Sequence, residues 1–283
     1  MVMIKRVLAL LGSGALAILL LRQAETAAQA VRDGVQLCLT SVVPALFPFF
    51  AVSSLLVALG AAEAAGRALA RPFRQLFRCG GAGCAALLLG LVGGYPVGAR
   101  TAAELVRRGK LSPAEGARLL TFCNNAGPAF AIGVAGVSVF GSARTGVWLY
   151  LLHCAAALLT GLLFCRRPLP VTAMPKRPVP PQTGLTGQFL RAVEGAVSAM
   201  ARVCGFVVFF LVLLRLAEGL IGPLPPLAAG VLELTNGILR LTPDRRGFVT
   251  AEALLGWGGL SVHCQTAAVT AGRSEERRVG KEC

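Results

Sequence analysis

Four clusters of glycine, proline and uncharged polar residues interrupt otherwise apolar stretches of this sequence. Their amide, hydroxyl and imidazole groups need hydrogen-bond partners, because an unpaired polar group in apolar surroundings costs on the order of several kcal/mol. Such groups can be paired by a small polar solute. The candidate binding residues are Gly93, Gly94, Tyr95, Pro96, Asn124, Asn125, Pro128, Thr235, Asn236, Gly237, Ser261, His263 and Gln265.

Each cluster also has a purely structural interpretation. Glycines such as Gly93 and Gly94 allow tight turns and close helix packing in membranes. A lone membrane histidine such as His263 often serves only to hydrogen-bond between helices. We favour ligand binding because Asn124 and Asn125 stand side by side where water is scarce, and both amides need partners there. Four further polar residues are interpreted as packing or interhelix pairing and left out of the site: His153, Cys154, Arg215 and Glu218.

The composition indicates a polytopic membrane protein. Of 283 residues, 55% are hydrophobic and 14% are charged, the mean hydropathy is +0.70, and apolar runs of about twenty residues recur. The formal net charge of +15 lies largely in short loops between these runs, as the positive-inside rule expects of cytoplasmic loops. We therefore expect a protein of the inner (cytoplasmic) membrane. Its partners are the lipid bilayer and a small-molecule solute, and nucleic acid is excluded.

The sequence contains no pattern typical of catalysis or metal binding. The nine cysteines show no paired spacing, and most lie in apolar runs, where cysteine behaves as a small hydrophobe. No HExxH or GxSxG motif and no paired intramembrane acids occur, so we expect neither an enzyme nor a cofactor nor a metal. The coupling ion and the oligomeric state stay open, a homo-oligomer included.

The apolar runs predict an all-α polytopic membrane protein of two inverted repeats, each with a spanning helix, a re-entrant hairpin and a broken helix. Residues 1–30 form an N-terminal membrane helix, although Ala28-Gln29-Ala30 also fits a signal-peptidase site. The first gate-type repeat covers 31–165, and a proline-rich basic linker follows at 166–186. The second repeat covers 187–272.

The first repeat begins with a span at Gln36–Gly60 and an amphipathic surface helix at Glu63–Arg78. The apolar piece from Gly80 to Val92 is too short to cross a bilayer, so it predicts a re-entrant hairpin that turns at the Gly-Gly-Tyr-Pro motif. Ser112-Pro113-Ala114-Glu115 has the form of a capping box. We expect it to start a helix that breaks at Asn124–Pro128.

The second repeat follows the same order after an ordinary span at Val147–Cys165 and the linker. Its long span ends before Pro223, and its hairpin is the glycine-broken piece Leu227–Leu241, which contains Leu234-Thr235-Asn236-Gly237. Its broken helix, Phe248–Ala271, is interrupted from Gly256 to Gln265. Interrupted segments at corresponding positions of inverted halves line transporter binding sites, so we expect the polar clusters to converge near the bilayer midplane.

The last eleven residues, Arg273–Cys283, read RSEERRVGKEC and look like the translation of a sequencing-adapter oligonucleotide. We interpret residues 273–283 as an adapter-derived artefact and exclude them from fold reasoning. On this interpretation the natural protein continues past Gly272. A genuine basic tail is the alternative.

Several motifs together resemble the YlbJ family of sporulation integral membrane proteins. They are Gly93–Arg100 (GGYPVGAR), the Ser-Pro-x-Glu helix start, Thr121–Asn125 (TFCNN) with Pro128, and Gly258–Gln265 (GGLSVHCQ). The resemblance implies a nucleoside-recognition or gate domain, related in plan to concentrative nucleoside transporters. It also implies dipicolinate transport across the outer forespore membrane during sporulation. A non-transporting gate or assembly component of a sporulation membrane complex is the alternative, and the second hairpin matches the family only weakly.

The basic linker 166–186 is expected to face the cytoplasm. A cysteine placed in it, with the native cysteines replaced, should react with a membrane-impermeant maleimide only after intact cells are permeabilised. Strong labelling from the outer face of intact cells would overturn the predicted topology.

Overall fold

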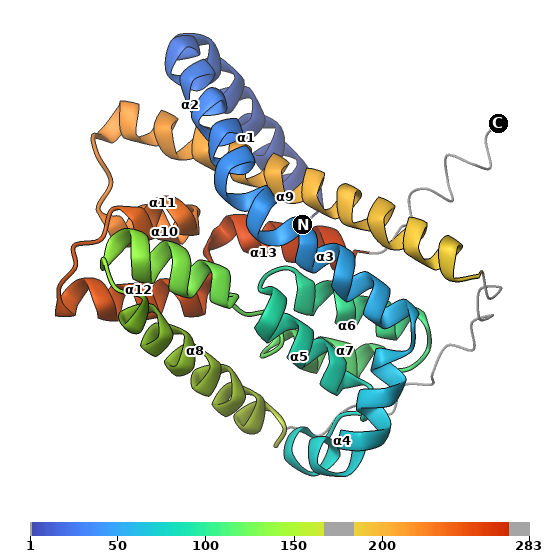
Figure 1. The fold of residues 1–283 in the computed structure, drawn as a ribbon. Helices are drawn as coiled ribbons and strands as arrows, with labels where there is room; N and C mark the ends of the chain where they lie inside the picture. The colour runs from blue at the N-terminus through green and yellow to red at the C-terminus, as the bar shows by residue number, and fades with distance from the viewer. Residues whose placement is uncertain (1, 167–183, 272–283) are drawn as a thin grey trace, which may run out of the picture.

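The computed structural model describes residues 2–166 and 184–271, and within them all regular structure is helical (Figure 1). The elements before the linker are α1 (Val2–Arg22), α2 (Ala24–Leu37), the π-helical turn η1 (Cys38–Val42), α3 (Val43–Ala58), α4 (Ala61–Phe77), α5 (Gly83–Gly93), α6 (Val97–Arg107), α7 (Pro113–Leu120), the π-helix η2 (Ala129–Val139) and α8 (Ala143–Phe164). Those after it are α9 (Leu185–Ile221), α10 (Pro226–Leu232), α11 (Leu234–Leu239), α12 (Arg245–Trp257) and α13 (Gly259–Thr270). The predicted all-α fold is confirmed for the described residues.

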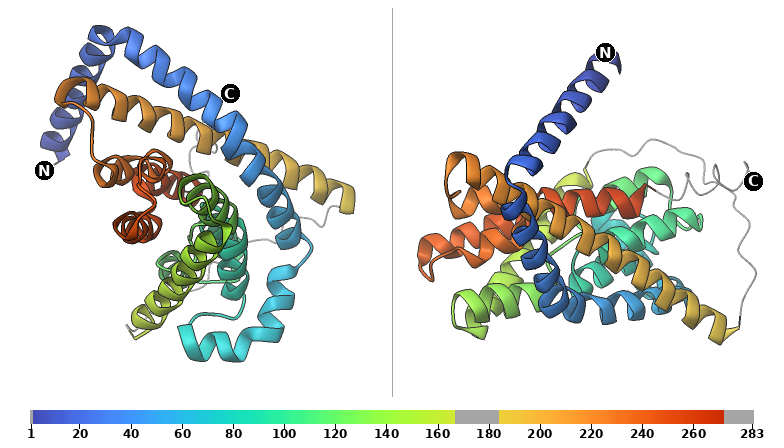
Figure 2. Two further views of the ribbon diagram at one scale, coloured as in Figure 1. Left: turned by 60° about the vertical axis from the view of Figure 1, so that its left-hand side comes forward. Right: turned by 90° about the horizontal axis from the view of Figure 1, so that it is seen from above.

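Two helices are long and apolar enough to cross a bilayer, α8 with 22 residues and α9 with 37. Arg6–Arg22 and Ala24–Val42 qualify together by the same criteria, with a bend of 94° between them. A helix of 37 residues is about 55 Å long, nearly twice the hydrocarbon thickness of a bilayer. It crosses one side of the molecule and packs against α2, α3 and α13 (Figure 2). The inverted and re-entrant topology stays a prediction.

The segment Gln36–Gly60, expected as one uniform span, is divided among three elements. It begins in the last turn of α2, widens into η1 and continues as α3 to Ala58. The wide turn directly precedes Pro44, which has no N–H to donate and whose ring would clash with the carbonyl one turn earlier in a regular α-helix. The proline therefore explains why the helix changes its pitch at this point.

The first hairpin packs on an aromatic core beside the amphipathic helix α4. Phe73 and Phe77 are each 4% exposed, whereas Arg71 and Arg74 are exposed, so the amphipathic character expected of this helix is present. The Phe77 ring stacks on Phe122 with the ring centroids 4.8 Å apart. α5 and α6 pack along each other as a helical hairpin on this core. The place of α4 on a membrane surface stays a prediction.

The first helix of each broken pair begins at a polar cap. The Ser112 hydroxyl accepts the Glu115 N–H at 3.2 Å, and the Glu115 carboxylate accepts the Ser112 N–H at 2.8 Å, which confirms the predicted capping box. In the second half, the Asp244 carboxylate accepts the Gly247 N–H at 2.6 Å. This bond from the Gly247 N–H holds the pKa of Asp244 below its ordinary value.

The second hairpin turns at Glu233, which divides the predicted piece Leu227–Leu241 between α10 and α11. Thr235, Asn236 and Gly237 lie within α11. The buried Glu233 carboxylate accepts the N–H groups of Thr235 at 3.2 Å and Asn236 at 2.8 Å, and thereby caps the start of α11. Gly237 serves close packing, since a Cβ there would lie 2.2 Å from the Cα of Gly230 on α10.

The interruption of the second broken helix is also shorter than the predicted Gly256–Gln265. It consists of Gly258 and the first residue of α13, Gly259, and each has a φ of +80°. Glycine adopts this left-handed conformation without steric cost, so two adjacent glycines are enough to separate α12 from α13. Ser261, His263 and Gln265 consequently lie on the first turns of a regular helix.

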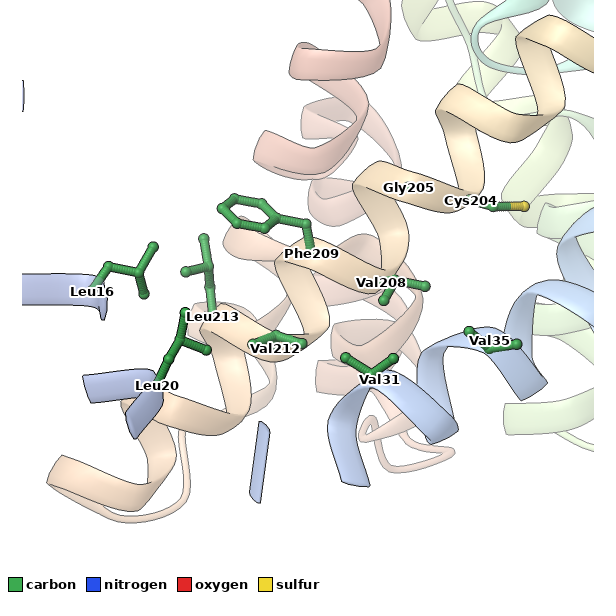
Figure 3. A pocket seen from close by; sticks show the side chains of 10 residues that line it. All are labelled: Leu16, Leu20, Val31, Val35, Cys204, Gly205, Val208, Phe209, Val212 and Leu213. Carbon is green, nitrogen blue, oxygen red and sulfur yellow. The ribbon is translucent and has the colours of Figure 1, made fainter. Parts of the chain in front are cut away.

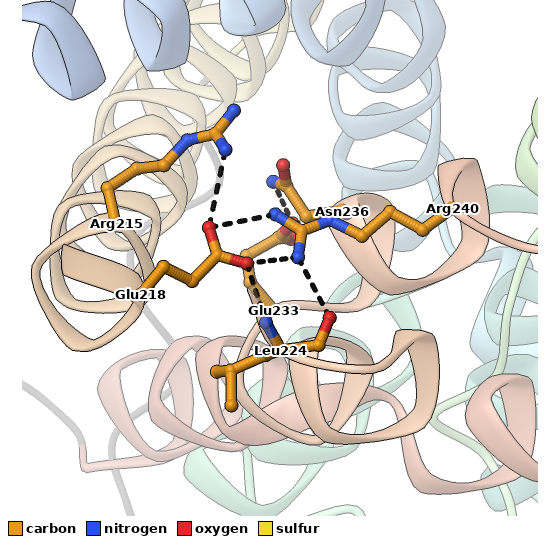
Figure 4. Close-up of polar contacts among 6 residues, drawn as sticks. All are labelled: Arg215, Glu218, Leu224, Glu233, Asn236 and Arg240. Carbon is orange, nitrogen blue, oxygen red and sulfur yellow. Dashed lines mark hydrogen bonds and ion pairs between the residues drawn. The ribbon is translucent and has the colours of Figure 1, made fainter. Parts of the chain in front are cut away.

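A carboxylate at the end of α9 joins that helix to the second hairpin (Figure 4). Glu218 accepts from Arg240, which directly follows α11, through both oxygens, and one of them also accepts from Arg215 at 3.3 Å. The other oxygen accepts the Leu224 N–H at 3.2 Å. Glu218 therefore pairs between two elements, as one of the interpretations expects, whereas Arg215 pairs within α9.

Two predicted segments fall largely outside the described residues. Residues 167–183 of the linker are not described, and its last residues, Leu185 and Thr186, belong to α9. Residues 273–283, interpreted as adapter-derived, also lie outside the described ranges.

Close backbone contact at the first hairpin predicts the effect of one glycine substitution. A Cβ at Gly98 would lie 1.7 Å from the Cys123 carbonyl oxygen, so Gly98→Ala should destabilise the protein by about 2–3 kcal/mol. Thermal unfolding in detergent measures this. Gly205→Ala on α9 is the matched control, since a Cβ there meets nothing within 4 Å and should leave the unfolding temperature unchanged or higher. Equal unfolding temperatures of the two variants would contradict the packing.

Candidate functional site

The tip of the first hairpin touches the break of the first broken helix. A Cβ on Gly94, whose φ is +75°, would lie 2.7 Å from the backbone nitrogen of Gly127. A Cβ on Gly127 would in turn lie 3.0 Å from the Cα of Gly94. The two glycines therefore let two backbones meet where no other residue pair would fit. Gly93 and Pro96 are also buried in this turn.

The same tip reaches the second break. The Tyr95 hydroxyl donates to the Leu255 carbonyl oxygen at 2.8 Å, and a Cβ on Gly258 would lie 3.6 Å from the Tyr95 ring. Leu255 is among the last residues of α12, whose carbonyls have no partner within the helix. Tyr95 thus pairs a carbonyl that the helix break leaves open and joins the two halves of the chain.

The second hairpin touches the second break in the same manner. A Cβ on Gly259 would lie 3.0 Å from the Leu234 backbone nitrogen and 3.1 Å from the Gly230 carbonyl oxygen. The glycine therefore admits the turn between α10 and α11. Each break consequently has the turn of its own hairpin against it.

Two of the candidate binding residues have buried polar atoms without partners. The Asn124 Nδ2 donates to the Thr266 hydroxyl of α13 at 2.8 Å, which brings the first break against the second broken helix. The Asn124 Oδ1 and the Ser261 Oγ are buried and have no hydrogen-bond partner within the described residues. Most buried polar atoms in proteins are paired, so these two are available to a ligand.

Asn125 and Pro128 lie at the first break, and their binding roles stay predictions. The Asn125 Nδ2 donates to the Phe122 carbonyl at 2.9 Å, within the same loop. The Ala126 N–H donates to Nε2 of His153 on α8 at 3.0 Å. Sequence reasoning left His153 out of the site, because its partner is a backbone group that only the folded chain brings near.

The remaining candidates divide into three groups. Gln265 is 4% exposed and lies on α13, the same helix as Ser261. His263 is exposed, and its ring lies 4.6 Å from the Trp257 ring, so it does not join the buried atoms. Asn236 bonds to Glu233 through Nδ2 at 2.8 Å, within its own hairpin. Binding roles for all these residues stay predictions.

A cavity of about 510 Å³ lies elsewhere, between α1, α2 and α9 (Figure 3). Its lining is apolar, and none of the candidate binding residues belongs to it; the lining residues are Leu16, Leu20, Val31, Val35, Cys204, Gly205, Val208, Phe209, Val212 and Leu213. A polar solute has no partners there. Within the described residues, no group of three or more His, Cys, Asp or Glu side chains could hold a metal ion.

Comparison with known proteins identifies relatives of this chain. Residues 39–143 match the Gate family model, described as nucleoside recognition. The matched segment contains the first hairpin and the first break. The chain is 26% identical to the sporulation integral membrane protein YlbJ of Bacillus subtilis (strain 168), over 85% of this chain and 70% of that protein. No solved structure matches the chain. The predicted family resemblance and a location in a membrane are confirmed.

The hydrogen bond from Ala126 to His153 makes a testable prediction. His153→Ala leaves a buried N–H unpaired and should destabilise the protein by about 1–3 kcal/mol. His263→Ala is the matched control, since this exposed histidine should change the free energy of unfolding by no more than about 0.5 kcal/mol. Thermal unfolding of both purified variants measures the difference. Equal stability of the two would show that His153 does not support the break.

Proposed function

We propose that this chain, a relative of YlbJ with a Gate domain, moves a small polar, anionic solute across its membrane between the two helix breaks. One observation carries the proposal: the buried Asn124 Oδ1 and Ser261 Oγ have no partners within the described residues. They come from different halves of the chain. A solute that bound between the breaks would pair both atoms.

The contacts of the hairpins support the same proposal. Each break lies against the turn of the hairpin that precedes it, through Gly94 and Gly127 in one half and Leu234 and Gly259 in the other. This correspondence supports two repeats with one structural plan. Helix breaks inside membrane transporters expose helix termini to a polar site, and helix N-termini favour anions.

We further propose dipicolinate as the solute, which the family resemblance implies, and the outer forespore membrane as its place of action. The relative's name, a sporulation integral membrane protein, supports a role in spore formation. Dipicolinate has two carboxylates, yet no Lys or Arg occurs at 119–140 or 248–272. Backbone N–H groups, the Asn124 amide and the Ser261 hydroxyl would bind it within the breaks. The proposal involves no enzymatic step and no cofactor.

Uptake of radiolabelled dipicolinate into proteoliposomes tests the proposal. Asn124→Ala and Ser261→Ala should each lower uptake at subsaturating solute by about tenfold, which corresponds to a loss of about 1.4 kcal/mol of stabilisation. Ser138→Ala is the matched control, because that serine is exposed on η2 and bonds to its own helix.

Two results would count against the proposal. Normal uptake by both alanine variants would show that Asn124 and Ser261 do not bind the solute, although the protein transports it. If the wild-type protein is folded and inserted in the membrane but transports no dipicolinate, then dipicolinate is not its solute. This result would favour a non-transporting gate or assembly component.

A further inference from the structure

An arginine of the first hairpin is partly buried, and one of its terminal nitrogens lacks a hydrogen-bond partner within the described residues. Arg100 lies on α6, one turn beyond Pro96 at the hairpin turn. Its Nη1 is buried and has no hydrogen-bond partner in the part of the chain that the structure describes. A guanidinium remains charged and carries five N–H donors, so a buried and unpaired one is unfavourable. The residue as a whole is only partly buried, which leaves it open to an incoming anion.

The Arg100 guanidinium lies closely against α9 at Gly195, and this contact is called the seat below. A Cβ at Gly195 would lie 2.6 Å from Arg100 Nη2, so a side chain at this position would displace it. Glycine in a helix interior is destabilising relative to alanine, and the seated guanidinium gives a reason for its presence. One residue farther along α9, Ala196 packs in a common buried cluster with Val97 of α6. The seat is therefore part of a tightly packed interface.

Cations outnumber acids around this seat. Glu104, one turn farther along α6, pairs with Arg107 at 2.8 Å and with Arg108 at 2.7 Å. Glu104 attracts Arg100 electrostatically, whereas Arg107 and Arg202 of α9 repel it. Glu194, next to Gly195, is exposed and forms no ion pair within the described residues. The Glu104 carboxylate is thus already paired with Arg107 and Arg108 and forms no hydrogen bond with Arg100, so Arg100 can take a further negative partner.

We propose that Arg100 binds an oxyanion group, a carboxylate or a phosphate, at this seat. Planar guanidinium groups bind such anions through paired N–H bonds. Under the function proposed above, on which this step rests, the anion is a carboxylate of the transported solute. Arg100 lies about 10 Å along α6 from Arg107 and the basic loop, toward the hairpin turn that contacts both breaks. It holds the solute before the solute reaches Asn124 and Ser261.

Equilibrium binding to the purified full-length protein in nanodiscs of zwitterionic lipid tests the seat. Dipicolinate and inorganic phosphate are titrated separately by calorimetry. Arg100→Gln and Gly195→Ala should each weaken binding of both anions by about tenfold or more. Arg108→Gln, a matched control on the same helix whose arginine is already paired with Glu104, should change binding by less than about twofold. Unfolding temperatures without anion confirm that the variants are folded.

A second set of nanodiscs containing phosphatidylglycerol distinguishes a solute from a lipid headgroup. If this lipid weakens dipicolinate binding to the wild type but has no effect on Arg100→Gln, the seat stands and takes a lipid phosphate. Equal binding of all anions by the wild type and a folded Arg100→Gln variant overturns the seat. Phosphate binding that depends on Arg100, in a protein without dipicolinate uptake, would refute the proposed transport and leave the seat standing.

Discussion

The pairing of backbone groups at the two helix breaks is the constraint on which this structure depends. A broken helix in apolar surroundings leaves N–H and C=O groups open, and water is scarce there. The first hairpin meets part of this demand, because its Tyr95 hydroxyl pairs the Leu255 carbonyl, and its tip also lies against Gly127. His153 of α8 accepts the Ala126 N–H. Glycines at the contacts are required because backbone must approach backbone.

Helix α9 holds the parts that carry these breaks. It packs against α2, α3 and α13, and near its C-terminal end Glu218 binds Arg240 of the second hairpin. Toward its N-terminal end, Gly195 seats Arg100 of the first hairpin. The second hairpin is thus attached to this helix by an ion pair, whereas the first packs on it through an apolar cluster that includes Val97 and Ala196.

Polar groups without partners follow one direction through the first hairpin and the breaks. Arg100 lies nearest the basic loop, and Asn124 and Ser261 lie where the hairpin tip and α13 meet the breaks. Under the proposed function, an anion would meet the positive charge of Arg100 before the neutral groups of Asn124 and Ser261. It would not be held too strongly at these neutral groups, because a charged pair deep in an apolar bundle would be costly to separate.

Local features of this protein could be predicted from the sequence by itself. The capping box at Ser112 depends on residues three positions apart, the first break coincides with a cluster of asparagine, glycine and proline, and the second coincides with a pair of glycines. The family motifs are contiguous stretches and were recognisable for the same reason. The turn at Glu233 was not predicted, because an apolar piece broken by glycine does not show which residue caps the following helix. The meaning of His153 and Arg100 was decided only by the tertiary structure, since each depends on a group far away in the sequence, the Ala126 N–H and the surface of Gly195. Residue types show which polar groups need hydrogen-bond partners. Which group becomes the partner depends on packing between segments that are distant in the sequence.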